Sequence, residues 1–147
     1  MLGSLISETT GRRIVRRVLG TNPPKVEVSF EDIGTALGVA TTGFGTYASV
    51  VRADGSLYGE GEGLIMTQGG DMIAWKGSGQ GQFGPGGTVS YSGILYFQTA
   101  TQKLAQLNSA PGVFEYEVDA AGNSQLKVWA WTSAQEAVKS AGASARP

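Results

Sequence analysis

Leu57–Phe97 reads LYGEGEGLIMTQGGDMIAWKGSGQGQFGPGGTVSYSGILYF, and this stretch decides the fold. It spans most of three runs, 57–67, 72–83 and 88–99, in which glycine or apolar residues alternate with polar ones. A period of two is the pattern of a β-strand with one buried face. The short glycine-containing turns between the runs are typical of antiparallel hairpins. The stretch therefore predicts three consecutive antiparallel strands.

The same pattern continues on both sides of this stretch. Further strands are expected over 25–37, 41–52, 113–119 and 124–132, and 12–19 suits either a strand or a short helix. A meander of about seven or eight strands has exposed edges unless it closes on itself. We therefore predict an all-β fold, a single antiparallel up-and-down β-barrel.

Two segments depart from the strand pattern. Ala100–Asn108 contains good helix formers, with Leu104 and Leu107 three apart, and predicts a short helix near 101–108. The Ala/Ser-rich tail 133–147 suits a second helix, because Ser133 and Glu136 have the spacing of a capping box. At 147 residues the chain has the length of one domain. We assign 1–132 to the barrel and 133–147 to a C-terminal tail.

The composition excludes several classes of chemistry. The chain has no cysteine and no histidine, which removes disulfides, thiolate nucleophiles, Cys/His zinc sites and Ser-His-Asp catalysis. Its net charge of -1 gives no general attraction to nucleic acid. Four arginines between 12 and 17 are the local exception, and an outer face or a contact between subunits explains them best. We expect no cofactor and no nucleic-acid partner.

No membrane or export signal is apparent in the sequence. No stretch approaches the ~20 apolar residues of a membrane span. Met1–Thr10 lacks the basic start and apolar run of a signal peptide. We therefore expect a cytoplasmic protein without a membrane partner.

Glycine gathers on the apolar face of the three central strands, and this face is expected to point into the barrel. Glycine inside a strand costs roughly 0.5–1 kcal/mol relative to alanine. Three explanations would account for that cost. The wall could bend tightly, large aromatic side chains could fill the space, or the gap could hold a small molecule. The two structural explanations lead. The candidates for filling are Phe30, Tyr47, Phe114, Tyr116, Trp129 and Trp131.

If the gap holds a ligand, its lining follows from the same alternation. The predicted lining comprises Leu57, Gly61, Ile65, Trp75, Gly79, Phe83, Tyr91, Gly93, Leu95, Phe97 and Phe114.

The carboxylates are the plentiful acid–base groups. Glu60 and Glu62 form one alternating pair, and Glu115 and Glu117 form another. Both pairs are expected on the solvated outer face, and only a reversed register would make them buried acids. Asp54, Glu60, Glu62 and Asp71 could gather at a barrel end, but no metal-binding spacing is present, so no metal site is predicted.

Two tryptophans suggest a contact surface. If Leu126, Val128 and Ala130 point inward, Trp129 and Trp131 lie on the outside. Exposed paired tryptophans are typical of a subunit interface or of a surface on which sugars stack. We favour the interface, and therefore a homo-oligomer.

Several of these runs resemble a known group of proteins. Leu57–Met66, Trp75–Gly79 and Gly112–Trp131 are similar to segments of a family of small uncharacterised prokaryotic proteins. The resemblance covers roughly 11–131 and implies no assigned activity. More loosely, the architecture is similar to allene-oxide-cyclase-like and lipocalin-like barrels, a likeness that implies fold and not function.

Two functions remain open. The leading one is a non-catalytic barrel that binds a small apolar molecule or acts as an oligomeric scaffold; a ligand binder should contain a cavity of ~300 Å³ or more. The alternative is a barrel cyclase or isomerase that shapes a small apolar substrate, with a tyrosine or glutamate supplying polarity. The enzyme requires a buried carboxylate or tyrosine that faces the cavity.

Overall fold

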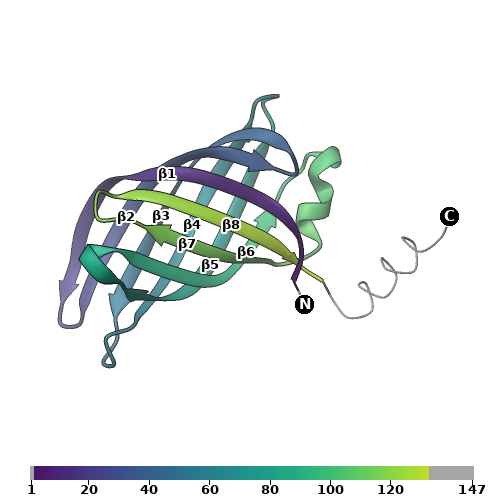
Figure 1. Cartoon of the computed structure of the whole chain (residues 1–147). Helices are drawn as coiled ribbons and strands as arrows, with labels where there is room; N and C mark the ends of the chain where they lie inside the picture. Colours follow the sequence, from purple (N-terminus) through teal and green to yellow (C-terminus); the bar gives the residue numbers. More distant parts are fainter. Residues whose placement is uncertain (1, 133–147) are drawn as a thin grey trace.

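The computed structural model describes residues 2–132 and shows a closed antiparallel barrel (Figure 1). Each strand pairs with the next along the chain, and β8 pairs with β1 to close the barrel. The elements are β1 (Leu2–Thr21), β2 (Pro24–Ala36), β3 (Val39–Val51), β4 (Leu57–Thr67), β5 (Met72–Phe83), η1 (Pro85–Gly87), β6 (Val89–Gln98), η2 (Gln102–Asn108), β7 (Gly112–Val118) and β8 (Asn123–Trp131). The predicted up-and-down barrel is confirmed. The helix expected in the tail lies outside the described residues.

The first strand is longer than the sequence pattern indicates. The prediction left 12–19 open between strand and helix and assigned no element to residues 2–10, whereas β1 runs unbroken from Leu2 to Thr21. Its pairing with β2 shifts register between Arg13 and Val15. Such a bulge changes which face each side chain occupies, and this explains why no single period describes this strand.

Two-residue turns set the register of neighbouring strands. Between β2 and β3, Leu37 and Gly38 both have positive φ, 50° and 78°. This is the φ pattern of the type I′ hairpin turn, which matches the natural twist of antiparallel strands. The turn ends β2 at Ala36, one residue before the predicted end of that strand.

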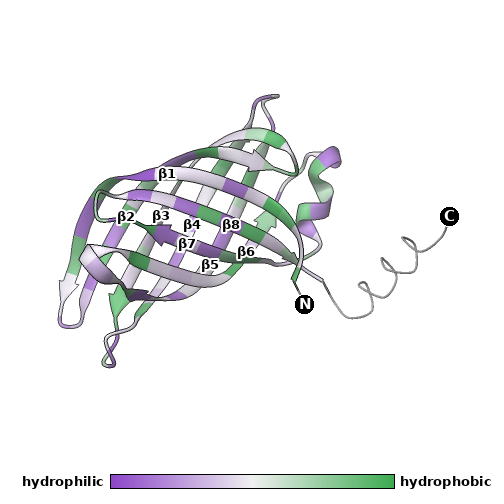
Figure 2. Ribbon diagram, viewed as in Figure 1, coloured by the Kyte–Doolittle hydropathy of each residue, from purple (hydrophilic) through white to green (hydrophobic). Residues whose placement is uncertain are grey.

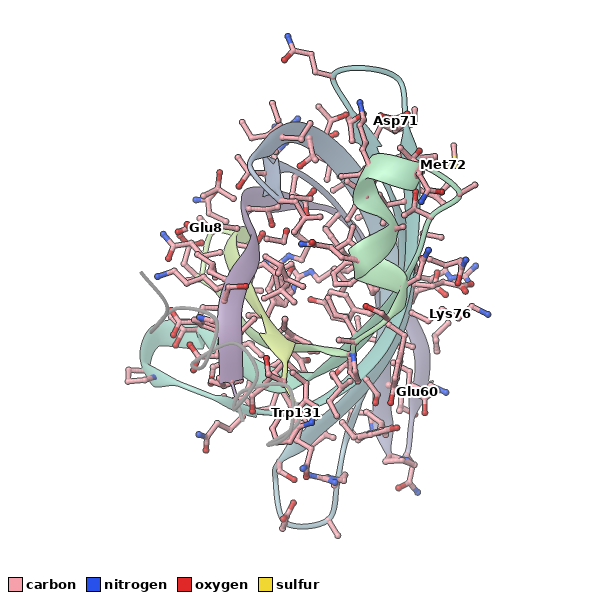
Figure 3. The ribbon with its side chains drawn as sticks, turned by 90° about the vertical axis from the view of Figure 1, so that its right-hand side faces the viewer. Glu8, Glu60, Asp71, Met72, Lys76 and Trp131 are labelled. Atoms are coloured by element: carbon pink, nitrogen blue, oxygen red, sulfur yellow. The ribbon has the colours of Figure 1, made fainter. Side chains whose placement is uncertain are left out.

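The short 3₁₀ helix η2 covers one end of the barrel (Figures 1 and 3). It follows β6, near 101–108 as predicted, and buries Leu104 and Leu107. These side chains belong to an apolar cluster with Ile6, Ile65 and Ile73. We call these five residues the η2 half of the interior. They form the continuous core on which the burial of apolar surface, and hence stability, depends.

Polar and apolar positions alternate along the barrel wall (Figure 2). In β4 the odd-numbered residues, from Leu57 to Thr67, face inward, while Glu60 and Glu62 are exposed. The inner face of β5 and β6 carries the odd-numbered residues in the same way. The predicted orientation of the glycine face is therefore confirmed. No helix within residues 2–132 has the length and apolar character needed to cross a membrane.

Candidate functional site

The inward glycines are covered by aromatic rings from neighbouring strands. Gly45 and Gly63 are paired with each other and lie between Phe30 on β2 and Trp75 on β5. A Cβ added at Gly63 would lie 2.5 Å from Trp75 Nε1, and one at Gly45 would lie 2.8 Å from Trp75 Cζ2. These glycines therefore make room for aromatic side chains. This finding supports the second of the three explanations, the filling of the space.

The rings form one connected cluster inside the barrel. Phe30 lies 6.2 Å from Trp75 in a stacked arrangement, and Tyr47 lies 6.0 Å from both Tyr91 and Tyr116. Aromatic pairs at such distances add about 0.5–1.5 kcal/mol beyond the area that they bury. Trp129 and Trp131 do not belong to this cluster, because both occupy outward-facing positions of β8.

Three of these aromatic residues bring hydroxyl groups into the interior. Tyr91 Oη lies 2.7 Å from Ser49 Oγ. Burial raises the pKa of Tyr47 far above its usual value, and the neighbouring Tyr116 and Tyr91 raise it further. Burial also raises the pKa of Tyr116, although hydrogen bonding to Ser124 and Tyr47 opposes the shift. All three phenols stay protonated at neutral pH and can donate a hydrogen bond.

The carboxyl group of Asp32 shares this space. Asp32 lies on the inner face of β2, paired with Gly11 on β1 and with Gly43 on β3. A Cβ at Gly43 would lie 2.6 Å from Asp32 Oδ1, so the glycine leaves room for that oxygen. The other oxygen, Oδ2, accepts a hydrogen bond from Thr9 Oγ1 at 3.3 Å. Burial raises the pKa of Asp32, and the bond from Thr9 lowers it by less.

We call Asp32, Tyr47, Tyr91, Tyr116 and Ser124 the tyrosine half of the interior. The sequence prediction missed Asp32, although a signal was present. Asp32 has the same parity as Val28 and Phe30, the apolar face of the predicted strand. A carboxylate on the apolar parity of a strand indicates a buried acid. Besides the tyrosines, the only acid–base groups that the prediction considered were the glutamates.

Two spaces meet at this carboxyl. A cavity of about 70 Å³ lies among the aromatic rings and reaches Trp75 and Phe114. A larger open depression, of about 1400 Å³, runs along the wall from β6 through β7, β8, β1 and β2 to β3. Asp32 and Ser124 border both spaces. Two of the polar side chains of the cavity therefore lie where it meets the depression.

The cavity among the aromatic rings is smaller than the volume predicted for a ligand binder. The expected volume was ~300 Å³ or more, whereas the aromatic rings leave about 70 Å³. A cavity of about 150 Å³ is what holds a benzene molecule. The expectation of a large apolar chamber is therefore wrong, because the side chains of neighbouring strands occupy the space above the glycines.

Most of the predicted lining residues face inward. Phe83 is an exception, since its side chain is 59% exposed at the end of β5. The chain turns away into Gly84 and η1 at this point, so no opposite wall covers the ring. The residues that face the interior are Leu57, Gly61, Ile65, Trp75, Gly79, Tyr91, Gly93, Leu95, Phe97 and Phe114.

The outer face carries the predicted glutamates and tryptophans. Glu60, Glu62, Glu115 and Glu117 are all exposed, as expected for a solvated face. Trp131 is 48% exposed and is paired with the exposed Leu2 of β1. Whether a second subunit covers this surface stays a prediction.

Two of the four arginines of the cluster on β1 are paired with acidic residues. Arg12 Nε lies 2.8 Å from Glu31 Oε1, and Arg17 Nη2 lies 3.2 Å from Glu27 Oε1. Both ion pairs join the outer faces of β1 and β2. The pairing supports the reading of the cluster as a solvated outer face.

Comparisons with known proteins show the fold and no activity. No protein-family model and no curated sequence matches the chain. A protein of unknown function from Clostridium acetobutylicum superposes with a TM-score of 0.78 at 14% identity, over 88% of this chain and 95% of that one. A β-barrel-like protein from Acinetobacter baumannii gives 0.75 at 12% identity, over 88% and 94% of the two chains.

A more distant match is an enzyme. It comes from Penicillium herquei and gives a TM-score of 0.57 at 15% identity, over 88% of this chain and 96% of that one. The chain thus shares its barrel with uncharacterised prokaryotic proteins, as the resemblance implied. At such low identities the likeness extends to the fold alone.

Proposed function

We propose that the tyrosine half of the barrel binds a small planar molecule with one polar group. The observation that carries this proposal is the position of Asp32 and Ser124, which border both the 70 Å³ cavity and the open depression. A ligand would place its polar head against these side chains, and the rest would lie in the depression. Ligand sites are commonly apolar and aromatic, with a few convergent polar groups.

The chemistry of the lining favours this ligand over the purely apolar one that the sequence predicted. Aromatic rings cover the walls, which suits a flat molecule. The tyrosine hydroxyls and the carboxyl supply both donors and acceptors. A hydrocarbon would leave the remaining hydrogen-bonding capacity of these groups unused, whereas a ligand with a polar head would use it.

Tryptophan provides an internal probe of this site. The chain has three tryptophans, of which Trp75 lines the cavity while Trp129 and Trp131 lie on the outward parity of β8. We expect phenol, titrated to millimolar concentration, to shift the indole N–H NMR signal of Trp75 saturably. The signals of the other two should not move. Equal movement of all three, or none at Trp75, would contradict the proposal.

Matched variants test the polar contacts. Tyr116→Phe removes a hydroxyl from the cavity, and Tyr96→Phe removes one from the outer face, where Tyr96 is 59% exposed. A hydrogen bond contributes about 0.5–1.5 kcal/mol. The first variant should therefore weaken phenol binding roughly two- to tenfold, and the second should leave it unchanged.

A second proposal concerns the outer face. We propose that Trp131 and its exposed neighbours on β1, Leu2 and Leu5, contact a second copy of the chain. Exposed apolar groups of this kind are enriched at interfaces between subunits. Light scattering should find an oligomer that Trp131→Glu dissociates. A wild-type monomer at high concentration would rule this contact out.

A further inference from the structure

We propose that Asp32 and Tyr116 make the tyrosine half a proton-transfer site for small enolisable ketones. The inference rests on the proposed binding site and adds a reaction to it. Asp32 would act as the base that moves a proton between two carbon atoms. Tyr116 would donate a hydrogen bond to the carbonyl oxygen of the substrate.

Asp32 has no cationic partner within the described chain. No Lys or Arg between residues 2 and 132 forms an ion pair with it, and its side-chain hydrogen bond comes from the neutral Thr9 hydroxyl. Desolvating a carboxyl without a cation is unfavourable, yet Asp32 is half-buried at the point where the cavity meets the depression, and Gly43 leaves room there for its Oδ1 atom. An acid without a cationic partner at such a junction suits a reactive group.

Tyr116 and Asp32 line the same small cavity. Burial is the largest cause that raises the pKa of Tyr116, and the Asp32 charge also raises it. The phenol therefore stays protonated beside the acid and remains a donor. A fixed donor at the oxygen where negative charge develops is a strong source of transition-state stabilisation.

The remaining residues narrow the reaction class. With no histidine and no cysteine in the chain, a carboxylate is the acid–base group available inside the barrel at neutral pH. Proton transfer by this carboxylate is therefore the reaction class that the composition of the site supports most directly.

The step balances without an oxidant or a cofactor. For a β,γ-unsaturated ketone, the Asp32 carboxylate removes a proton from the carbon between the carbonyl and the double bond. The electron pair moves onto the carbonyl oxygen, which Tyr116 stabilises as a dienolate. The protonated Asp32 then returns the proton to the γ-carbon, and the product is the conjugated ketone. The carbonyl oxygen would enter the small cavity that Tyr116 lines, while the ring of the dienolate stays in the open depression beside Asp32.

The test uses the β,γ-unsaturated isomer of cyclohexenone as substrate. Ultraviolet absorbance follows the conjugated product, and NMR in D₂O follows deuterium entering the carbon next to the carbonyl. Asp32→Asn should lower the rate by about a hundredfold or more, the usual contribution of a general base. Tyr116→Phe should lower it by a smaller factor. Glu115→Gln and Tyr96→Phe, which alter the outer face, should leave it unchanged.

The pH profile distinguishes a base from a structural residue. The rate should rise with pH as Asp32 ionises and then level off, and Asp32→Asn should abolish this rise. The NMR spectrum of Asp32→Asn confirms that the variant is folded.

Binding is measured separately through the Trp75 indole signal with the same ketone. A saturable shift without isomerisation or deuterium uptake above the buffer rate would overturn the proton-transfer proposal and leave the binding site standing. No shift and no reaction would overturn both. A reaction that survives Asp32→Asn would also contradict the role of this residue.

Discussion

The η2 half and the tyrosine half of the interior are built on the same eight strands, but they are filled differently. In the η2 half, the helix inserts Leu104 and Leu107 among isoleucines, and the packing is apolar. In the tyrosine half, rings lean over glycines around a carboxyl and several hydroxyls, and within residues 2–132 no helix enters. One half is thus filled by apolar packing, whereas the other keeps polar groups beside a small cavity, and it is to this second half that we assign the proposed binding.

The largest expected effect comes from the η2 half. Leu104 is 2% exposed, and Leu104→Ala should lower the free energy of unfolding by about 2–5 kcal/mol, through lost burial and the cavity left behind. Urea denaturation measures this loss. A loss below about 0.5–1.5 kcal/mol, the loss expected from removing one hydrogen bond, would mean that the helix does not hold the barrel together.

The glycines give the next largest effect. Gly63→Ala forces a methyl group against the Trp75 indole and should cost about 1–3 kcal/mol. The matched variant is Gly59→Ala, where the nearest atom to the added methyl would be 3.5 Å away. It should be neutral or stabilising, by up to about 1 kcal/mol, because alanine suits a strand better than glycine. Equal losses of stability in Gly63→Ala and Gly59→Ala would indicate that these glycines allow the wall to bend tightly, rather than make room for aromatic side chains.

A smaller effect is expected within the tyrosine half. Tyr91→Phe removes the 2.7 Å hydrogen bond to Ser49 and keeps the ring. The loss should be about 0.5–1.5 kcal/mol, measured by the same denaturation experiment. Tyr58→Phe, whose hydroxyl bonds the exposed Glu60, is the matched outer control and should change little.

The smallest effect on stability is expected for Asp32→Asn at acidic pH. The difference in stability between this variant and the wild type grows as the pH rises. Below the usual pKa of 3.8, Asp32 is protonated in both the folded and the unfolded state. As the pH rises towards the higher pKa of the folded state, the unfolded state ionises first, so the wild type loses stability. The asparagine variant lacks this loss. Thermal unfolding should therefore show its stability relative to wild type rising with pH, and a falling difference would mean that the folded pKa is lowered.

The fold could be predicted from the sequence because the alternation in β4, β5 and β6 is regular and the turns are short. The first half of β1 could not, since residues 2–10 mix polar and apolar positions around register shifts near Leu5. Backbone pairing with β8, a distant part of the chain, stabilises this segment. Such long-range pairing leaves no local signal.

The candidate site was only partly predictable. The alternation of inward-facing and outward-facing positions along each strand correctly placed three residues, Trp75, Tyr91 and Phe114, in the interior. The cavity volume depends on how Trp75 and Phe30 lean over Gly45 and Gly63, and a period cannot encode that geometry. Asp32 was visible in the alternation of β2, but as a lone acid it gave no motif to recognise.

The most direct test of the central claim is a crystal structure of the protein grown with saturating phenol. The account predicts a phenol ring in the open depression, with its hydroxyl at the mouth of the cavity, within hydrogen-bond reach of Asp32 or Tyr116. The side chains of the η2 half should stay unmoved. Phenol bound only on the outer face or among Ile65, Ile73 and Leu104, or none bound at all, would contradict the assignment of binding to the tyrosine half.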